Sequence, residues 1–162
     1  MLTTLYCDAS FCPHQLVGGW AIWIRSERGR FVENGKTPDY CQNSSEAELV
    51  AIYAGIYRTL TRWPETTAIL VRSDCTAALD WMVGRHHPKK ESGQRVANKI
   101  QQLKHQRGVR LIPRWVKAHR EGSETDVYLN RRVDKLAREM MVGQRKGQNL
   151  PASQIVEMIV YV

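Results

Sequence analysis

Four acidic residues lie where predicted strands end or predicted helices begin. They are Asp8, Glu48, Asp74 and Asp134. A hard divalent cation takes oxygen ligands, and two cations about 4 Å apart need several carboxylates that converge from different elements. Because each of these acids belongs to a different predicted element, the chain carries the residue types for a two-metal centre.

Each acid except Asp8 also has a purely structural interpretation. Asp74 could serve as the N-cap of the helix that follows it, and Glu48 could be the acid of a Ser45-x-x-Glu48 capping box. Asp134 could be a first-turn acid that faces the positive end of a helix dipole. No helix start near Asp8 needs an acid, so the residues alone leave both interpretations open for the other three.

Apolar periodicity predicts an α/β fold in a single domain. We expect five strands, at residues 2–7, 20–24, 30–33, 68–71 and 109–115. We expect four helices: one that begins near residues 43–45 and ends before Trp63-Pro64, one over residues 75–83, one that ends near Gly108, and one over residues 130–144. Turns at Ser26–Gly29 and Asn34-Gly35 make the first three strands an antiparallel meander. Alternating helices and strands then add parallel strands, so the sheet is mixed and flanked by helices.

Ligands of such sheets bind beyond the carboxyl ends of the parallel strands. Asp8, Asp74 and His119 follow three of the predicted strands, so we expect them at one edge of the sheet. The fifth strand contains Pro113, which is tolerated only near a sheet edge or a bulge.

The positive charge of the chain is concentrated in one segment. The 162 residues carry 24 Lys or Arg and 16 Asp or Glu, for a net charge of +8. Residues 85–120 hold eleven of the basic residues and a single acid, Glu91. A basic cluster of this kind suggests a polyanionic partner such as a nucleic acid.

Several classes of protein do not fit the sequence. The apolar runs are far too short for a membrane span, and the start lacks the pattern of a secretory signal. The four cysteines, Cys7, Cys12, Cys41 and Cys75, form no CxxC pair and have no His at zinc-finger spacing. We therefore expect buried free thiols and a location in the reducing cytoplasm.

Five short motifs in order give the chain a resemblance to a known family. The motifs are Cys7-Asp8-Ala9-Ser10 followed by Gly18-Gly19-Trp20-Ala21-Ile22, then Ala47-Glu48-Leu49-Val50-Ala51, Ser73-Asp74-Cys75, Trp115-Val116-Lys117-Ala118-His119, and Asn130-Arg131-Arg132-Val133-Asp134-Lys135-Leu136-Ala137. Together they resemble type 1 ribonuclease H over roughly residues 1–143. One such motif would be weak evidence, but five in register are specific.

The resemblance implies an endonuclease that cleaves the RNA strand of RNA–DNA hybrids. It implies that Asp8, Glu48, Asp74 and Asp134 are the ligands of two Mg²⁺ ions, with Mn²⁺ as the alternative metal. It also implies that His119 assists the attacking water or the departure of the product. Glu46 competes with Glu48 from the residues alone, and only the Ala-Glu-Leu register of the family favours Glu48.

The family resemblance and the basic segment together indicate residues that hold the hybrid. Contacts to the 2′-hydroxyls and to the DNA phosphates are expected from polar and basic side chains. These are Ser10, Asn43, Ser44, Ser45, Lys89, Lys90, Arg95, Lys117 and Asn130. The segment around Lys89 lies where some bacterial members carry a basic protrusion, although the insertion here is shorter.

Three features depart from the familiar members of the family. Ala9 replaces the glycine that usually follows the first Asp, and residues 11–17 lack an Asn that contacts the minor groove. The stretch between His119 and Asp134 is longer and carries Glu121, Glu124 and Asp126. We expect these acids to lie on a solvated loop, the alternative being that they bias metal binding and His119.

The last residues are not covered by the resemblance. We divide the chain into a catalytic domain, residues 1–145, and an apolar tail, residues 146–162, that packs into the core of the same domain. The alternatives are that the tail adds a strand to a sheet edge or contacts a partner. We expect a monomer. Two other functions stay open: a resolvase-like or transposase-like nuclease that acts on DNA with the same fold, and a non-catalytic nucleic-acid-binding module.

Overall fold

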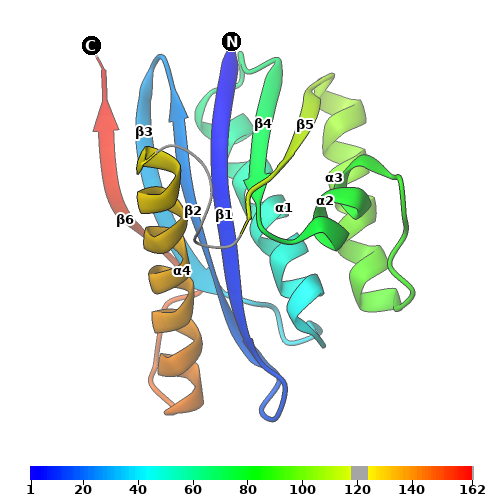
Figure 1. Cartoon of the computed structure of the whole chain (residues 1–162), viewed down its shortest axis with the longest axis vertical. Coiled ribbons are helices and arrows are strands. Elements are labelled where there is room, and N and C mark those ends of the chain that lie inside the picture. Colours follow the sequence, from blue (N-terminus) through cyan, green and yellow to red (C-terminus); the bar gives the residue numbers. More distant parts are fainter. Residues whose placement is uncertain (118–123, 162) are drawn as a thin grey trace.

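The chain folds into one mixed sheet with helices on both of its faces (Figure 1). The computed structural model describes residues 1–117 and 124–161. Its strands are β1 (Leu2–Cys12), β2 (Val17–Ser26), β3 (Gly29–Lys36), β4 (Ala68–Ser73), β5 (Arg110–Trp115) and β6 (Ser153–Val160). Its helices are α1 (Ser44–Arg62), α2 (Thr76–Val83), α3 (Glu91–Arg107) and α4 (Glu124–Arg145). The predicted fold class is confirmed, but the sheet has six strands instead of five.

The first strand lies in the interior of the sheet, whose order is β5-β4-β1-β2-β3-β6. β1, β2, β3 and β6 pair antiparallel, whereas β4 is parallel to both β1 and β5. The predicted meander of three strands, with its turn at Ser26–Gly29, is therefore confirmed. β5 is an edge strand, which explains how it accommodates Pro113.

Side chains of the central strands alternate between two apolar layers, one on each face of the sheet. Leu5, Ile22 and Ile24 belong to the layer that contains the buried residues of α1, α2 and α3. Tyr6 and Trp23 belong to the opposite layer, which α4 covers. This arrangement explains why residues 20–24 of β2 are apolar without interruption: both faces of that strand are buried.

A glycine allows α4 to lie close to the sheet. A Cβ atom on Gly19 would lie 2.3 Å from the carbonyl oxygen of Ala137 and 2.5 Å from Cβ of Met140. No side chain fits between β2 and the backbone of α4 at this point. The predicted glycine pair thus has a packing role in addition to its place in the motif.

Two predicted boundaries in the first three strands are wrong. β1 continues beyond Cys7 to Cys12, so Asp8 lies inside the strand and not after its end. Asn34 and Gly35 do not form a turn, since they pair with Ala21 and Trp20 on β2 and with β6 on the other side. The pairing with β6, a strand formed by the tail, keeps this segment extended.

The start of α4 and the tail also differ from prediction. α4 begins at Glu124, six residues before the predicted start at Asn130, so Asp126 lies on a helix and not on a solvated loop. The tail does not pack into the core. It forms β6, which pairs with β3 at the sheet edge and leaves most of its side chains exposed, Ile155 and Val160 among them.

The prediction of buried free thiols is confirmed for three of the four cysteines. Cys7, Cys12 and Cys41 are buried and Cys75 is half-buried, and all four are free. None of the helices that the structure describes is both long and apolar enough to cross a membrane.

Candidate active site

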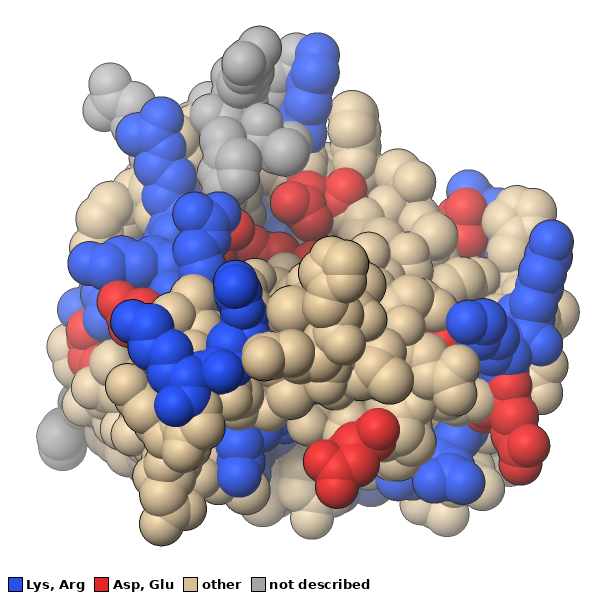
Figure 2. Space-filling model, turned by 90° about the horizontal axis from the view of Figure 1, so that it is seen from below, with Lys and Arg blue, Asp and Glu red and all other residues tan. Residues whose placement is uncertain are grey.

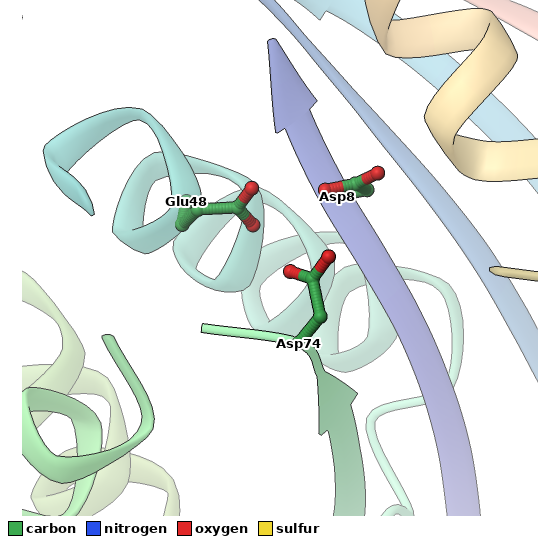
Figure 3. Close-up of side chains that lie close together, drawn as sticks. All are labelled: Asp8, Glu48 and Asp74. Atoms are coloured by element: carbon green, nitrogen blue, oxygen red, sulfur yellow. The ribbon is translucent and has the colours of Figure 1, made fainter. Parts of the chain in front are cut away.

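Three of the four predicted acids lie together at one place on the sheet. Asp8 comes from β1, Asp74 directly follows β4, and Glu48 lies near the start of α1 (Figure 3). One carboxylate oxygen of each residue lies within 4.8 Å of those of the other two. Asp8 and Glu48 are buried, whereas Asp74 is exposed, so the group opens to solvent on the side of Asp74.

The parallel pairing of β1 and β4 places the two aspartates. The last paired residues are Tyr6 and Arg72, and each aspartate stands two residues further along its own strand direction. Since side chains alternate across a strand, both carboxylates emerge at corresponding positions where the two strands stop pairing. Asp74 is therefore a member of the group and does not cap α2, whose N-cap is Cys75.

The cap of α1 decides between Glu46 and Glu48. Asn43 is the N-cap: its Oδ1 accepts a hydrogen bond from the backbone nitrogen of Glu46 at 2.9 Å, and its Nδ2 donates to Oε2 of Glu46 at 2.7 Å. Glu46 is thus the acid of the capping box. The predicted Ser45–Glu48 box is wrong, and Glu48 is left to face Asp8.

Burial disfavours the ionised forms of Asp8 and Glu48. It raises the pKa of Asp8 to about 7, and the charges of Asp74 and Asp134 add to this effect. Burial also raises the pKa of Glu48 well above its ordinary value, with a further contribution from the charge of Asp8. A bound cation would offset both costs, because it favours the ionised carboxylates.

Only one of the two carboxylate oxygens of Glu48 accepts a hydrogen bond from a described residue. Its Oε1 accepts from the backbone nitrogen of Ala9 at 3.1 Å, but its Oε2 is buried without a hydrogen-bond partner among the described residues. A buried carboxylate oxygen of this kind is costly unless a ligand satisfies it. The residues therefore fit a divalent cation with oxygen ligands.

The fourth predicted acid is not part of this group. Asp134 lies on α4, where its Oδ2 is 3.4 Å from Nη2 of Arg138, and it is close enough for its charge to raise the pKa of Asp8. Its role as a metal ligand stays a prediction. His119 lies outside the described residues, as does the end of the motif that begins at Trp115.

The predicted contacts to nucleic acid lie on several elements. Ser10 pairs with Gly19 on β2, and Ser44 and Ser45 open α1 beside its N-cap Asn43. Asn130 is half-buried on α4, and Lys117 is exposed after β5. The side chain of Asn43 forms hydrogen bonds with Glu46 as the N-cap of α1.

Figure 2 shows a face on which one group of carboxylates, in the upper part of the view, has Lys and Arg side chains beside it, while further carboxylates lie apart from that group. Lys89 and Lys90 are exposed just before α3, and Lys90 is its N-cap. The guanidinium of Arg95 lies over the ring of Tyr40, 4.7 Å from its centroid, so that its position is fixed by stacking.

One set of polar residues near the acids was not predicted. Asp126 on α4 accepts a hydrogen bond from the hydroxyl of Tyr6 and forms an ion pair with Arg72. The sequence does contain a signal for it, because Tyr6 and Arg72 each stand two residues before one of the clustered aspartates.

The fold is similar to several solved structures. The N-terminal RNase H domain of Rv2228c from Mycobacterium tuberculosis, solved as a fusion with maltose binding protein, matches with a TM-score of 0.68 at 18% identity, covering 90% of this chain and 97% of that one. RNase H1 from the archaeon Halobacterium salinarum matches with a TM-score of 0.65 at 16% identity, covering 88% and 98%. LC11-RNase H1, isolated from compost, matches in its complex with an RNA/DNA hybrid with a TM-score of 0.66 at 18% identity, covering 88% and 99%.

The family comparison covers most of the chain. The comparison with curated proteins gave no match. The family model for RNase H, however, matches residues 2–142, which span β1 to α4 and all four predicted acids. The chain therefore belongs to the RNase H family.

Proposed function

We propose that this protein is an endonuclease that hydrolyses the RNA strand of RNA–DNA hybrids at the group formed by Asp8, Glu48 and Asp74. The observation that carries the proposal is the convergence of three carboxylates from three elements, with Oε2 of Glu48 buried and without a hydrogen-bond partner in the part of the chain that the structure describes. Membership of the RNase H family supports this reaction class. The LC11 relative, solved with an RNA/DNA hybrid, supports the choice of substrate.

Two divalent cations, with Mg²⁺ as the first choice and Mn²⁺ as the alternative, would complete the site. Asp8, Glu48 and Asp74 would hold one side of the metal pair, and Asp134 would supply a ligand from α4. Bound there, the ions would supply an activated water and neutralise charge on the leaving 3′ oxygen. We assign to His119 the transfer of a proton to or from the reacting groups, since an unperturbed imidazole titrates near neutral pH.

We assign recognition of the hybrid to two groups of side chains. Ser10, Ser44 and Ser45 are polar residues near the acids, and they suit contacts with the 2′-hydroxyls that distinguish RNA from DNA. Lys89, Lys90 and Arg95 suit contacts with the phosphates of the DNA strand. The exposed position of both lysines supports this division of roles.

Cleavage of labelled duplexes tests the proposal. The protein is incubated with an RNA–DNA hybrid, duplex DNA or duplex RNA, in Mg²⁺ or in EDTA. We expect cleavage of the hybrid alone, only with metal, and a loss of about a hundredfold or more in Asp74→Asn, because a metal ligand is removed. Asp74 is exposed, so this variant should fold.

The control for Asp74→Asn is Glu27→Gln. Glu27 is exposed in the turn between β2 and β3, and its substitution removes one carboxylate charge while leaving the group of three acids unchanged. It should cleave at the wild-type rate. Equal cleavage of duplex DNA would indicate a DNA-acting nuclease, and hybrid binding without any cleavage would indicate a non-catalytic module; either result would refute the proposal.

A further inference from the structure

Three side chains from β1, β4 and α4 interact beside the candidate active site. The hydroxyl of Tyr6 donates a hydrogen bond to Oδ1 of Asp126. Nη1 of Arg72 lies 3.4 Å from Oδ2 of the same carboxylate. The guanidinium of Arg72 also lies over the ring of Tyr6, 5.4 Å from its centroid. Each of the three side chains thus contacts the other two, and we refer to Tyr6, Arg72 and Asp126 as the clamp.

Each residue of the clamp also lies within eight residues of one of the four acids along the chain. Tyr6 and Arg72 are directly paired neighbours on β1 and β4. They stand two residues before Asp8 and Asp74, respectively, so they share a sheet face with the aspartates one step away. Asp126 lies in the first turn of α4, eight residues before Asp134, which is about 12 Å along a rigid helix.

The surroundings make the clamp a strong connection. Tyr6 is 5% exposed, and the side chains of Arg72 and Asp126 are 24% and 15% exposed. Solvent therefore screens the ion pair only in part, and charge-assisted hydrogen bonds in such places are stronger than neutral ones. Separating α4 from the strands would leave a partly buried carboxylate without these two partners, which is unfavourable.

The clamp connects α4 to a strand that its apolar face does not cover. Leu129, Val133 and Ala137 pack with side chains of β1, β2 and β3. The pair between Asp126 and Arg72 reaches one strand further, to β4, which carries Asp74 at its end. The position of α4 relative to β4 therefore depends on polar contacts of Asp126.

We infer that the clamp sets the position of Asp134 relative to Asp8 and Asp74, and that Asp126 is a positioning residue for metal binding. This inference rests on the proposed function, in which Asp134 supplies a ligand from α4. Asp134 lies outside the group of three acids but close enough to influence Asp8 electrostatically. A small rotation of α4 about its apolar contacts would change the approach of Asp134, and the clamp opposes that rotation at the first turn.

Two conservative variants test the inference. Tyr6→Phe keeps the ring and its contact with Arg72 but removes the hydroxyl, and Asp126→Asn keeps the size of the side chain but removes its charge. For Asp126→Asn we expect the Mg²⁺ concentration that gives half-maximal hybrid cleavage to rise about tenfold, as for other residues that orient metal ligands. At saturating Mg²⁺ the rate should return to within about twofold of the wild type, because excess metal compensates for a misplaced ligand. Tyr6→Phe should shift in the same direction by a smaller factor.

A measurement without substrate separates this role from a loss of stability. The melting temperature is followed as Mg²⁺ is added, and the midpoint of its rise should shift to higher concentration in both variants. The matched control is Arg132→Met, which removes the 2.8 Å pair between Arg132 on α4 and Glu157 on β6. This variant should melt at a lower temperature but keep the wild-type Mg²⁺ midpoints.

The possible results are distinct. Unchanged Mg²⁺ midpoints in Tyr6→Phe and Asp126→Asn would overturn the inference, and so would an equal shift in Arg132→Met. If Asp126→Asn does not fold, Tyr6→Phe decides the question, since it changes one oxygen atom. A wild-type protein that does not cleave hybrids would refute the proposed function, whereas the thermal titration would still decide whether the clamp affects metal binding.

Discussion

At the scale of single residues, Asp8 and Glu48 are acids that are buried, and burial disfavours the ionised carboxylates that a metal ion needs as ligands. The two residues are 7% and 8% exposed, which is unusual for acids with no ion pair to Lys or Arg among the described residues. The same burial that raises the pKa of each group makes a divalent cation a favourable neighbour. The metal-free protein should therefore carry extra protons that metal binding releases.

The pH dependence of stability tests this description. The pKa of Asp8 is about 7 in the folded protein, above the ordinary value of 3.8, so the folded state holds more protons than the unfolded state between these values. The free energy of unfolding in EDTA should fall by on the order of 2 kcal/mol from pH 5 to pH 8 through Asp8 alone. Thermal unfolding in EDTA at several pH values measures it.

The control for this prediction is Asp8→Asn, which removes the titrating group. Its stability should vary less with pH over the same range, and Mg²⁺ at pH 8 should stabilise it less than the wild type. A wild-type protein that becomes more stable from pH 5 to pH 8 while Asp8→Asn does not would contradict the assigned direction.

Residue patterns could predict which acids lie together, but they could not predict which residue caps α1 and so which glutamate faces Asp8. The family register predicts the three clustered acids, although Asp8 lies inside β1 and not at its end. The choice between Glu46 and Glu48 depends on which polar residue caps α1, and Asn43, Ser44 and Ser45 are all good N-caps. Only the folded backbone shows that Asn43 takes this position.

At the scale of elements, the contact between β2 and α4 depends on the absence of a side chain at Gly19. We expect Gly19→Ala to lower the free energy of unfolding by about 2 kcal/mol, in the range of other overpacked sites. Its Cβ atom would meet the backbone of Ala137 and the Cβ of Met140, so α4 must move. Denaturant unfolding in EDTA measures the effect.

Gly108→Ala provides the comparison for this effect. Gly108 has a φ of +60°, so its substitution strains the backbone. No described atom lies within 4 Å of a Cβ built on it, so the new side chain displaces no neighbouring helix or strand. It should cost about 1 kcal/mol and leave the Mg²⁺ midpoint of hybrid cleavage unchanged. Gly19→Ala should shift that midpoint as well, because α4 carries Asp134. An effect of Gly19→Ala no larger than that of Gly108→Ala would contradict the close approach.

Elements with regular apolar patterns were predictable, and those shaped by distant partners were not. α1, α2 and β4 follow from local periodicity and turn residues. In contrast, Asn34-Gly35 is a strong turn signal that the pairing of β6 overrides, and α4 begins early at polar residues that include Asp126. Local patterns do not report a partner strand more than a hundred residues away.

At the scale of the whole molecule, the charge has a specific arrangement. The acids that would hold metal lie in a chain that is otherwise basic, with exposed lysines between α2 and α3. Bound cations would reduce the repulsion between the acids and a polyanion, and the lysines would attract its phosphates. Binding of a hybrid should therefore depend on both metal and salt.

Salt titration tests the role of Lys89 and Lys90. The double variant Lys89→Ala/Lys90→Ala, made with Asp74→Asn to prevent cleavage, should bind hybrid more weakly. The slope of log affinity against log salt should become shallower by roughly 0.9 for each lost phosphate contact. Fluorescence anisotropy at several salt concentrations measures both effects.

A second double variant controls for net charge. Arg62 ends α1 and Arg110 begins β5, so both lie near the amino-terminal ends of β4 and β5, away from Asp74. Arg62→Ala/Arg110→Ala, also made with Asp74→Asn, removes the same charge and should keep the slope of Asp74→Asn alone. Equal slopes for the two double variants would show that Lys89 and Lys90 make no particular contact with the phosphates.

The position of α4 in the chain has a consequence for biosynthesis. β1 and β2 lie in the interior of the sheet, and one of their faces is covered by Leu129, Val133 and Ala137, which are synthesised more than a hundred residues later. Until α4 leaves the ribosome, the side chains of Tyr6 and Trp23 have no covering helix. A nascent chain in which β1 and β2 but not α4 have left the ribosome therefore exposes an apolar surface that chaperones can bind.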